Sequence, residues 1–368
     1  MVISVQDVLP STGGNFVVDE NVAACLPEGS TILEAVTWGA SAWTKTAKIS
    51  TRLADGSEKA YFLKCATERG EIMMKGEFTS ISTIREVIPS LAPKPYGWGK
   101  FKTSDTYFFL MDFLQLKMSL PNPVKLSSRI VELHQKSVSP TGQFGFVVPT
   151  CHGKNLQQNT WTPSWRACFT EFITWFFEED VRVNGQWHEF DSAFAKLQAE
   201  TIPRMLDPLQ ADGRVIKPCL VHGDLWDENT GVDVESGEPV VFDASCMYAH
   251  NEYEIGMWRR EIIRFNQPYI RQYLMRFPPS EPAGQWDDRN RLYSIKFNFG
   301  HSISFPGSPL IREQMLNDMT YLNNKYSSAT AVPSVNMSSA FSTTTNTGIS
   351  PPNMIVEEAK KIAGGVKI

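Results

Sequence analysis

A ten-residue stretch at positions 220–229, Leu-Val-His-Gly-Asp-Leu-Trp-Asp-Glu-Asn, constrains this chain more than any other part of the sequence. It places His222, Asp224 and Asn229 in the spacing H-x-D-x-x-x-x-N, which is that of a kinase-type catalytic loop. Such a loop needs a carboxylate that orients and deprotonates an attacking hydroxyl, and an amide oxygen that binds Mg²⁺. We therefore predict that Asp224 is the catalytic base and that Asn229 is a metal ligand.

The segment that follows predicts a hairpin that brings a second acid to the same place. Residues 239–242, Pro-Val-Val-Phe, form a short apolar run in front of Asp243, which is typical of a strand. Ser236-Gly237 is a turn signal between Asn229 and this strand. An Asp after a glycine is by itself most often a turn residue. The combination of loop, turn and strand favours a site in which Asn229 and Asp243 bind Mg²⁺.

Lys64 and Glu77 match the part of a kinase that binds the nucleotide. Lys64 ends the run Tyr-Phe-Leu at 61–63, where a strand presents a cation to the α- and β-phosphates of ATP. Glu77 follows thirteen residues later on an expected helix and is the predicted partner of Lys64. A solvent-exposed strand lysine is the simpler alternative, and the catalytic loop downstream favours the functional interpretation.

The expected elements of the first third have the order found in the smaller lobe of a kinase. The β-like patterns at 32–36, 44–50 and 60–65 predict strands. Apolar residues that recur every three to four positions predict a helix over 71–87, and the continuous apolar run 107–111 predicts a buried strand. We therefore expect an antiparallel sheet with one helix.

Two further stretches complete the expected nucleotide site. The loop at 38–44 occupies the position of a phosphate-covering loop, and its Gly39 and Ser41 are candidate contacts for phosphate oxygens. One glycine in such a loop is a weak signal by itself. The hinge between the lobes should follow the last strand, with Met111 and Phe113 as candidate contacts for the nucleotide.

The amino-acid sequence of the catalytic loop and of the residues after it is similar to that of a known family. His-Gly-Asp-Leu-Trp-x-x-Asn at 222–229, Phe-Asp at 242–243 and Tyr-Ala-His-Asn-Glu-Tyr-Glu at 248–254 resemble the fructosamine kinase (ketosamine-3-kinase) family, within the aminoglycoside-phosphotransferase-like branch of the protein-kinase-like fold. The resemblance covers roughly residues 28–326. It implies a bilobal α+β fold, with an antiparallel-sheet N-lobe and a mainly helical C-lobe, that uses ATP and Mg²⁺.

Composition and the resemblance together divide the chain. We expect an N-terminal arm at 1–27, the N-lobe at 28–114, the helical C-lobe with the catalytic loop at 115–326 and a Ser/Thr-rich tail at 327–368. The tail contains few bulky apolar residues and is expected to be disordered, with a short helix over 355–362 as the alternative for its end.

Charge and cysteine usage exclude several classes of protein. The net charge is −5 and the sequence has no dense Lys/Arg run, so we expect no nucleic-acid partner. No apolar stretch of about 18 residues and no signal-peptide pattern occurs, so we expect a cytoplasmic protein that does not bind membranes. The six cysteines are scattered without a C-x-x-C pair, which indicates reduced thiols.

The acceptor is the part of the function that the residues constrain least. The resemblance nominates the 3-hydroxyl of a fructosamine or ribulosamine adduct, either a small molecule or a glycated protein. His250, Glu252 and Glu254 follow the metal-binding strand and are candidate contacts for the adduct, with a structural role as the alternative for His250. Trp161 lies in a second stretch, 144–165, that is similar to the family's insert near the acceptor cleft.

Three departures from related sequences bear on regulation and on the acceptor. Gly223 replaces the arginine that protein kinases place before the catalytic aspartate, so regulation by a phosphorylated loop is not expected. Ala42 and Trp43 stand where many ketosamine kinases carry a cysteine, and Trp-Arg-Arg-Glu-Ile-Ile at 258–263 replaces a helix of small residues. The competing functions are a kinase of another aminoglycoside- or amino-alcohol-like metabolite and a nucleotide-binding pseudokinase.

Overall fold

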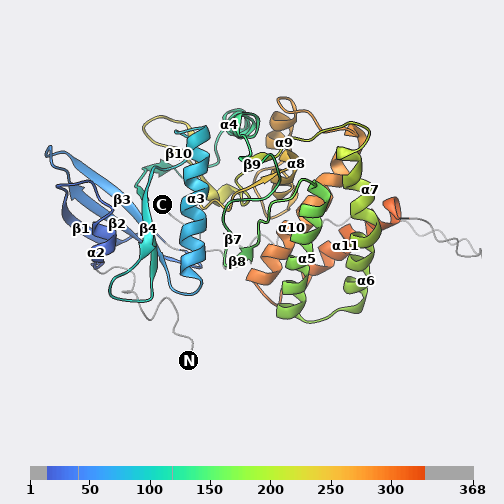
Figure 1. The fold of residues 1–368 in the computed structure, drawn as a ribbon, viewed down its shortest axis with the longest axis horizontal. Coiled ribbons are helices and arrows are strands. Elements are labelled where there is room, and N and C mark those ends of the chain that lie inside the picture. The colour runs from blue at the N-terminus through green and yellow to red at the C-terminus, as the bar shows by residue number, and fades with distance from the viewer. Residues whose placement is uncertain (1–14, 40, 118, 328–368) are drawn as a thin grey trace, which may run out of the picture.

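A five-stranded antiparallel sheet forms the smaller of two lobes in the computed structural model (Figure 1). The structure describes residues 15–39, 41–117 and 119–327; the expected helix at 355–362 and the tail from 328 to 368 lie outside them. The strands follow the order β1-β2-β3-β5-β4. They are β1 (Thr31–Thr37), β2 (Lys45–Arg52), β3 (Glu58–Ala66), β4 (Pro95–Lys100) and β5 (Tyr107–Asp112).

The central hairpin of this sheet agrees with the sequence prediction and determines where Lys64 points. β2 pairs with β3 from Lys45 opposite Cys65 to Arg52 opposite Glu58. The last six residues of β3 are buried, because each face of the sheet packs against its own apolar cluster. Lys64 shares the face of Phe62, which belongs to the cluster that also holds residues of the helix α3. The lysine therefore points toward that helix.

Strand β4 is an element that the sequence prediction missed. It begins at Pro95 and contains Gly97 and Gly99, and these residue types are unfavourable inside a strand. β4 is the edge strand of the sheet and pairs only with β5, and an edge position tolerates a proline because one side of the strand donates to no neighbour.

Helix α3 (Gly70–Val87) lies between the sheet and the larger lobe (Figure 1). Its buried Met74, Ile81 and Ile84 recur at helical spacing, as predicted for 71–87. The ring of Phe78 meets that of Phe109 on β5 edge-to-face at 5.9 Å. Glu77 lies on the same helix and thus faces the region where the two lobes meet.

The larger lobe is mainly helical. Its helices are α4 (Pro123–Lys136), α5 (Trp165–Asn184), α6 (His188–Lys196), α7 (Ile202–Leu206), α8 (Asn251–Glu254), α9 (Gln267–Leu274), α10 (Trp286–Ser304) and α11 (Pro309–Tyr326). Three small antiparallel sheets accompany them: β6 (Leu116–Lys117) with β10 (Thr230–Asp233) and β11 (Pro239–Val241), β7 (Thr150–His152) with β8 (Asn155–Gln157), and β9 (Cys219–Val221) with β12 (Met247–Ala249). The short helix α2 (Glu20–Ala23) belongs to the smaller lobe.

An aromatic cluster forms the centre of the larger lobe. Trp165 at the start of α5 is fully buried, and its ring nitrogen donates to the hydroxyl of Tyr293 on α10 at 2.8 Å. Phe169 packs against the same tyrosine at 5.1 Å between ring centroids. The aromatic residues of α5 therefore serve mostly as core.

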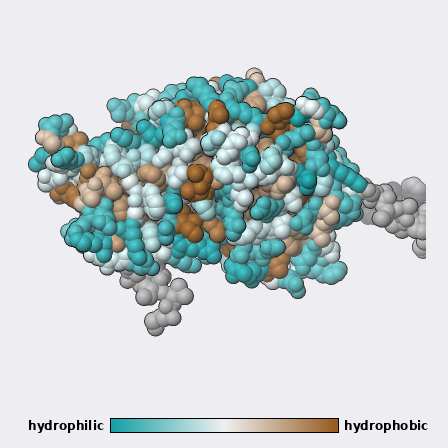
Figure 2. Space-filling model, in the orientation of Figure 1, coloured by the Kyte–Doolittle hydropathy of each residue, from teal (hydrophilic) through white to brown (hydrophobic). Residues whose placement is uncertain are grey.

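The surface and the cysteines match the composition. Hydrophobic side chains on the face shown in Figure 2 gather in small separate patches between hydrophilic ones. Within the described ranges, no helix combines the length and the apolar character that a membrane span requires. All six cysteines are free thiols, which agrees with the sequence expectation.

Backbone hydrogen bonds fix the predicted catalytic loop to the hairpin that ends at Asp243. β10 pairs with β11 as the predicted hairpin, with Thr230 opposite Val241. The amide of Ser245 donates to the carbonyl of His222 at 2.9 Å. Between them, Gly223 has φ +82°, and a Cβ at this position would lie 2.1 Å from the carbonyl oxygen of Ser245. The loop therefore leaves no room for a side chain at residue 223.

We expect Gly223→Ala to lower the free energy of unfolding by about 2–5 kcal/mol, since it adds a steric clash to the cost of a left-handed conformation. Gly237→Ala is the matched control, because Gly237 has φ +66° and open space around its missing Cβ. It should lose only the conformational part, about 1–2 kcal/mol. Urea denaturation measures both, and equal losses would contradict the steric account.

Candidate active site

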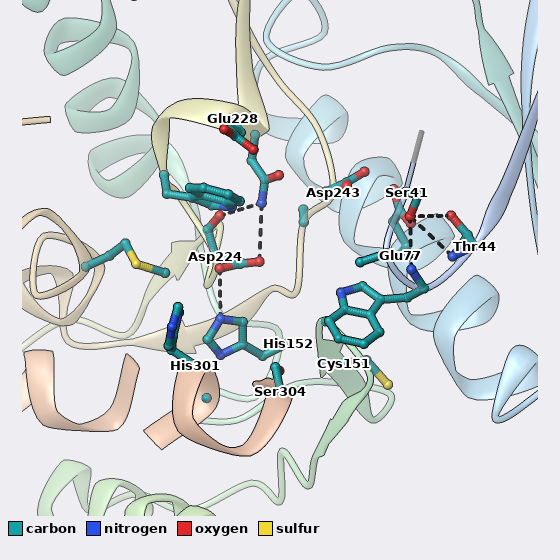
Figure 3. A pocket seen from close by; sticks show the side chains of 18 of the residues that line it. Ser41, Thr44, Glu77, Cys151, His152, Asp224, Glu228, Asp243, His301 and Ser304 are labelled. Carbon is teal, nitrogen blue, oxygen red and sulfur yellow. Dashed lines mark hydrogen bonds and ion pairs between the residues drawn. The ribbon is translucent and has the colours of Figure 1, made fainter. Parts of the chain in front are cut away.

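A cavity of about 330 Å³ opens between the two lobes. The smaller lobe contributes Ser41, Trp43, Lys64 and Glu77 to its wall, and the larger lobe contributes the catalytic loop, the residues after β11 and part of α10. Asp224, Asn229 and Asp243 all border it. Figure 3 shows Asp243 between Asp224 on one side and Ser41 and Glu77 on the other, and Lys64 contacts both Glu77 and Asp243. The sequence-predicted catalytic, metal and lysine positions thus meet in one place.

Lys64 contacts one carboxylate of its own lobe, Glu77, and one of the larger lobe, Asp243. Its Nζ donates to Glu77 Oε1 at 2.8 Å and Oε2 at 3.0 Å, and it also contacts Asp243 Oδ1. Burial raises the pKa of Glu77 to about 7, and the neighbouring Asp243 adds to this effect while Lys64 opposes it. Burial would lower the pKa of Lys64, but the two carboxylates outweigh it and raise that pKa. The lysine is therefore a fixed cation at neutral pH.

Asp224 is held from both sides by side-chain nitrogens. His152 on β7 places Nε2 3.0 Å from Asp224 Oδ1, and Figure 3 shows this ring pointing at the carboxylate. Asn229 Nδ2 donates to the backbone oxygen of Asp224 at 2.8 Å and to Oδ2 at 3.2 Å. Burial would raise the pKa of Asp224, but the nearby His152, His222 and Lys296 lower it. Asp224 is therefore ionised at neutral pH, as a base requires.

Asn229 and Asp243 together offer the donor set that Mg²⁺ prefers. The Asn229 amide nitrogen is used on Asp224, which leaves its amide oxygen for a cation, and Asp243 supplies a carboxylate. The amide of Phe242 donates to the carbonyl of Asn229 at 3.1 Å and keeps the two ligands adjacent. Within the described residues, no cluster of three or more His, Cys, Asp or Glu forms a metal site by itself. Phosphate oxygens and water would have to complete the coordination.

The loop between β1 and β2 borders the cavity only in part. Ser41 and Thr44 line the wall, and the Ser41 hydroxyl accepts from the backbone amide of Thr44 at 3.2 Å. Gly39 has φ +79° but does not line the cavity. Trp43 reaches across to the larger lobe, where its ring lies 5.8 Å from that of Phe305. The loop therefore contributes the indole of Trp43 as well as two hydroxyl groups to the wall of the cavity.

The two predicted hinge contacts lie outside the cavity wall. Met111 is buried in the core of the lobe. Phe113 packs edge-to-face on Trp38 at 5.2 Å, and Lys48 Nζ lies 4.6 Å from its ring centroid. In this arrangement both side chains support the sheet, and a contact with the nucleotide stays a prediction.

The four side chains predicted to contact the acceptor do not border the cavity. Glu252 is fully buried and receives two hydrogen bonds from Arg289, at 2.7 and 2.9 Å. His250 is buried between the hydroxyls of Tyr293 and Ser280, each at 2.9 Å. The short helix α8 turns these residues into the core, so the expected acceptor contacts are corrected to structural ones.

Glu254 and Trp161 also have structural contacts. Glu254 is fully buried, and its carboxylate accepts from the backbone amides of His222 and Gly223, the latter at 3.1 Å. Trp161 packs on Tyr248 with 6.0 Å between ring centroids. The glutamate thus holds the catalytic loop from behind instead of facing a substrate.

Sequence reasoning missed three basic residues beside Asp224. His152 comes from the β7–β8 hairpin, Lys296 from α10, and Arg260 from the segment after β12. Lys296 is fully buried, donates to Gln157 Oε1 at 2.8 Å and lies 3.4 Å from His152 Nδ1, and burial lowers its pKa to about 7. The one feature of the sequence that pointed to this region was the segment 258–263, which differs from related sequences and contains Arg260.

Comparison with known proteins places the chain in one family. Residues 36–321 match the sequence profile of the fructosamine kinase family. The chloroplastic protein-ribulosamine 3-kinase of Oryza sativa subsp. indica is 30% identical over 66% of this chain and 67% of its own length. The ketosamine-3-kinase of Mus musculus is 26% identical over 62% of this chain and 77% of its own length.

A solved structure shares the fold. The crystal structure of a protein assigned as a fructosamine-3-kinase from Thermobifida fusca superimposes with a TM-score of 0.62. It is 18% identical in sequence, and the match covers 84% of this chain and all of that one. At this identity the likeness establishes the fold, and the predicted bilobal, protein-kinase-like α+β architecture is confirmed.

We predict that His250 makes stability depend on pH between its unfolded and folded pKa values. Burial lowers the pKa of His250 from 6.5 to about 4, with Glu252 opposing this shift. The unfolded chain binds the proton more readily, so the contribution is complete above pH 6.5 and is lost as the pH falls toward 4. The loss amounts to about 3 kcal/mol.

Urea denaturation at several pH values measures this slope. His250→Gln should show a shallower loss of stability than the parent protein between about pH 6.5 and 4.5, because the titrating group is gone. His188→Gln, at an exposed position, should keep the parental slope. A parental slope in the His250 variant would mean that this ring is not held neutral by burial.

Proposed function

Because the chain belongs to the fructosamine kinase family, we propose that it transfers the γ-phosphoryl group of ATP to the 3-hydroxyl of a fructosamine or ribulosamine adduct. As a member of this family the protein is an ATP-dependent phosphotransferase. The observation that carries the proposal is that one cavity brings together an ionised Asp224, Asn229 and Asp243, with the Lys64–Glu77 pair in contact with Asp243.

Asp224 would orient the acceptor hydroxyl and receive its proton. The ionised Asp224 carboxylate can only accept a hydrogen bond, so Nε2 of His152 carries the ring proton and donates to Oδ1, while Nδ1 faces Lys296 Nζ at 3.4 Å. Oδ2 is held only by Asn229 at 3.2 Å, and this oxygen is the proposed proton acceptor. The neutral His152 ring keeps the carboxylate from rotating, which preserves the orientation that the reaction needs.

Lys64 would bind the nucleotide phosphates, with Glu77 holding the lysine in place. Its contact with Asp243 keeps the charges of this region balanced until the phosphates arrive. Asn229 and Asp243 would hold Mg²⁺, which when bound neutralises negative charge on the phosphoryl groups. The Asp243 carboxylate and the Asn229 amide oxygen are oxygen donors of the kind that a divalent cation prefers.

The cysteines support a reducing compartment. All six are free thiols, and burial raises the pKa of Cys65, Cys168 and Cys246 among them. Thiols with a raised pKa are poor nucleophiles and are slow to form disulfides. We therefore place the reaction in the cytoplasm.

We predict that Asp224→Asn lowers kcat by about 10²–10⁴-fold, because an amide cannot take the hydroxyl proton. ATP affinity should change little, since Lys64, Glu77 and Asp243 remain. Steady-state kinetics with a fructosamine acceptor measures the first effect, and calorimetry measures the second. Glu235→Gln, an exposed position, is the control for a charge change without loss of activity. Parental kcat in the Asn variant would remove Asp224 as the base.

For Asp243→Ala we predict that ATP binding no longer responds to Mg²⁺, because one of the two protein ligands is lost. Calorimetric titrations with ATP, with Mg²⁺ and with EDTA, give the ratio of the two affinities. The parent protein should bind ATP more tightly with Mg²⁺, and the variant should bind it equally in both conditions. An unchanged Mg²⁺ dependence would exclude Asp243 from the metal site.

A further inference from the structure

Two buried basic side chains beside Asp224 lack a carboxylate partner. They are Arg260, which is 6% exposed, and Lys296, which is fully buried. Among the described residues, no carboxylate oxygen lies within 4.0 Å of either side chain. Asp224 is the carboxylate whose charge acts most strongly on both, and Glu254 also acts on Lys296. Burial lowers the pKa of Lys296 to about 7, so Arg260 is the one of the two that keeps its full charge at neutral pH, and an unpaired charge is costly in a buried site.

Arg260 lines the cavity and has donors to spare. Its Nε donates to Asn298 Oδ1 at 2.7 Å, and Nη1 approaches the sulfur of Met257 at 3.4 Å. Nη2 is buried and has no hydrogen-bond partner. Burial lowers the pKa of Arg260 only to about 10, so the guanidinium stays charged at neutral pH. A buried charged donor without an acceptor is strongly unfavourable, and an anionic ligand in the cavity would satisfy it.

The neighbouring arginines of the same segment do have carboxylate partners. Arg259 pairs with Asp287 at 2.7 Å, and Arg264 pairs with Asp227. Both of these cations have their own carboxylate, whereas Arg260 between them has an amide oxygen and a thioether. The unpaired guanidinium is therefore the one that borders the cavity without a counter-ion.

We propose that the acceptor carries a carboxylate and that Arg260 binds it. The inference rests on the proposed function and narrows its substrate class. A sugar attached to the α-amino group of a free amino acid has a carboxylate one carbon away from the amine, whereas a glycated lysine side chain within a protein has none nearby. A planar guanidinium binds a carboxylate through parallel hydrogen bonds. Adducts of free amino acids are thus the favoured substrates.

The experiment compares two acceptors that differ in one group. N-fructosylglycine carries the carboxylate, and N-fructosylglycinamide carries a neutral amide of nearly the same shape. The parent protein should phosphorylate the glycine adduct with a kcat/KM about tenfold or more above that of the amide. An adduct of aminomethylphosphonate, as a third acceptor, distinguishes a carboxylate site from one that prefers a phosphoryl anion.

Variants then assign the preference to one side chain. Arg260→Met should reduce kcat/KM for the glycine adduct to that for the amide, so that the ratio falls to about one. Arg260→Lys, which keeps the charge in a smaller group, should retain part of the preference and also serves if the Met variant does not fold. Arg259→Met removes the adjacent surface-paired arginine and should keep the parental ratio.

Calorimetric binding of the two adducts, with AMP-PNP present, separates this inference from the proposed reaction. Tighter binding of the glycine adduct, together with no phosphoryl transfer to it when ATP replaces AMP-PNP, would support the anion site and contradict the proposed reaction. Equal use of the two adducts by the parent protein, a preference for the phosphonate, or a parental ratio in Arg260→Met would overturn the inference and leave the reaction standing. Binding of neither adduct would overturn both.

Discussion

The buried carboxylate of Glu254 is the constraint on which the site depends. It accepts hydrogen bonds from the backbone amides of His222 and Gly223, which are the two residues before the catalytic aspartate. His222 in turn donates from Nε2 to the carbonyl oxygen of Phe242, at 2.9 Å, next to Asp243, the proposed metal ligand. A carboxylate that accepts from backbone amides forms strong, charge-assisted hydrogen bonds. One glutamate therefore fixes the catalytic loop and, through His222, the end of β11.

The same arrangement separates charge within the cavity. Toward the smaller lobe, Lys64 contacts both Glu77 and Asp243, and a divalent cation with phosphate oxygens could join this group of charges. On the other side of Asp224, the charged guanidinium of Arg260 has no carboxylate within 4.0 Å among the described residues. Asp224 lies between the two regions, and the nearby basic side chains help to keep it ionised. This distribution of charge is the basis on which we propose the nucleotide for one end of the cavity and the acceptor for the other.

The sequence predicted those parts of the site whose geometry is determined locally. The spacing from Asp224 to Asn229 is closed by one short loop, and the turn at Ser236-Gly237 brings Asp243 back beside them, so residue order alone was sufficient. The Lys64–Glu77 contact was also predicted, because one strand and the following helix have a standard relation in this lobe. Short connections and family spacing carry this information.

The acceptor region could not be predicted in the same way. Glu252 follows the metal-binding strand closely, but its direction is decided by Arg289, which lies 37 residues later on α10. The basic residues near Asp224 come from three separate segments, and only the packed fold brings them together. An isolated Lys296 on a helix of mostly buried residues gives no sign of its surroundings in the sequence. Side chains assembled over long range are where reasoning from local pattern fails.

The position of Gly223 bears on whether a phosphorylated segment could regulate the loop. Protein kinases place an arginine there, which a phosphorylated segment can bind. Here the left-handed backbone and the carbonyl of Ser245 leave no space for a side chain, and the internal carboxylate of Glu254 takes over the anchoring role. The catalytic loop is then ordered by folding alone. Because this carboxylate is buried with the amides that it accepts from, the contacts that order the loop all lie within the fold.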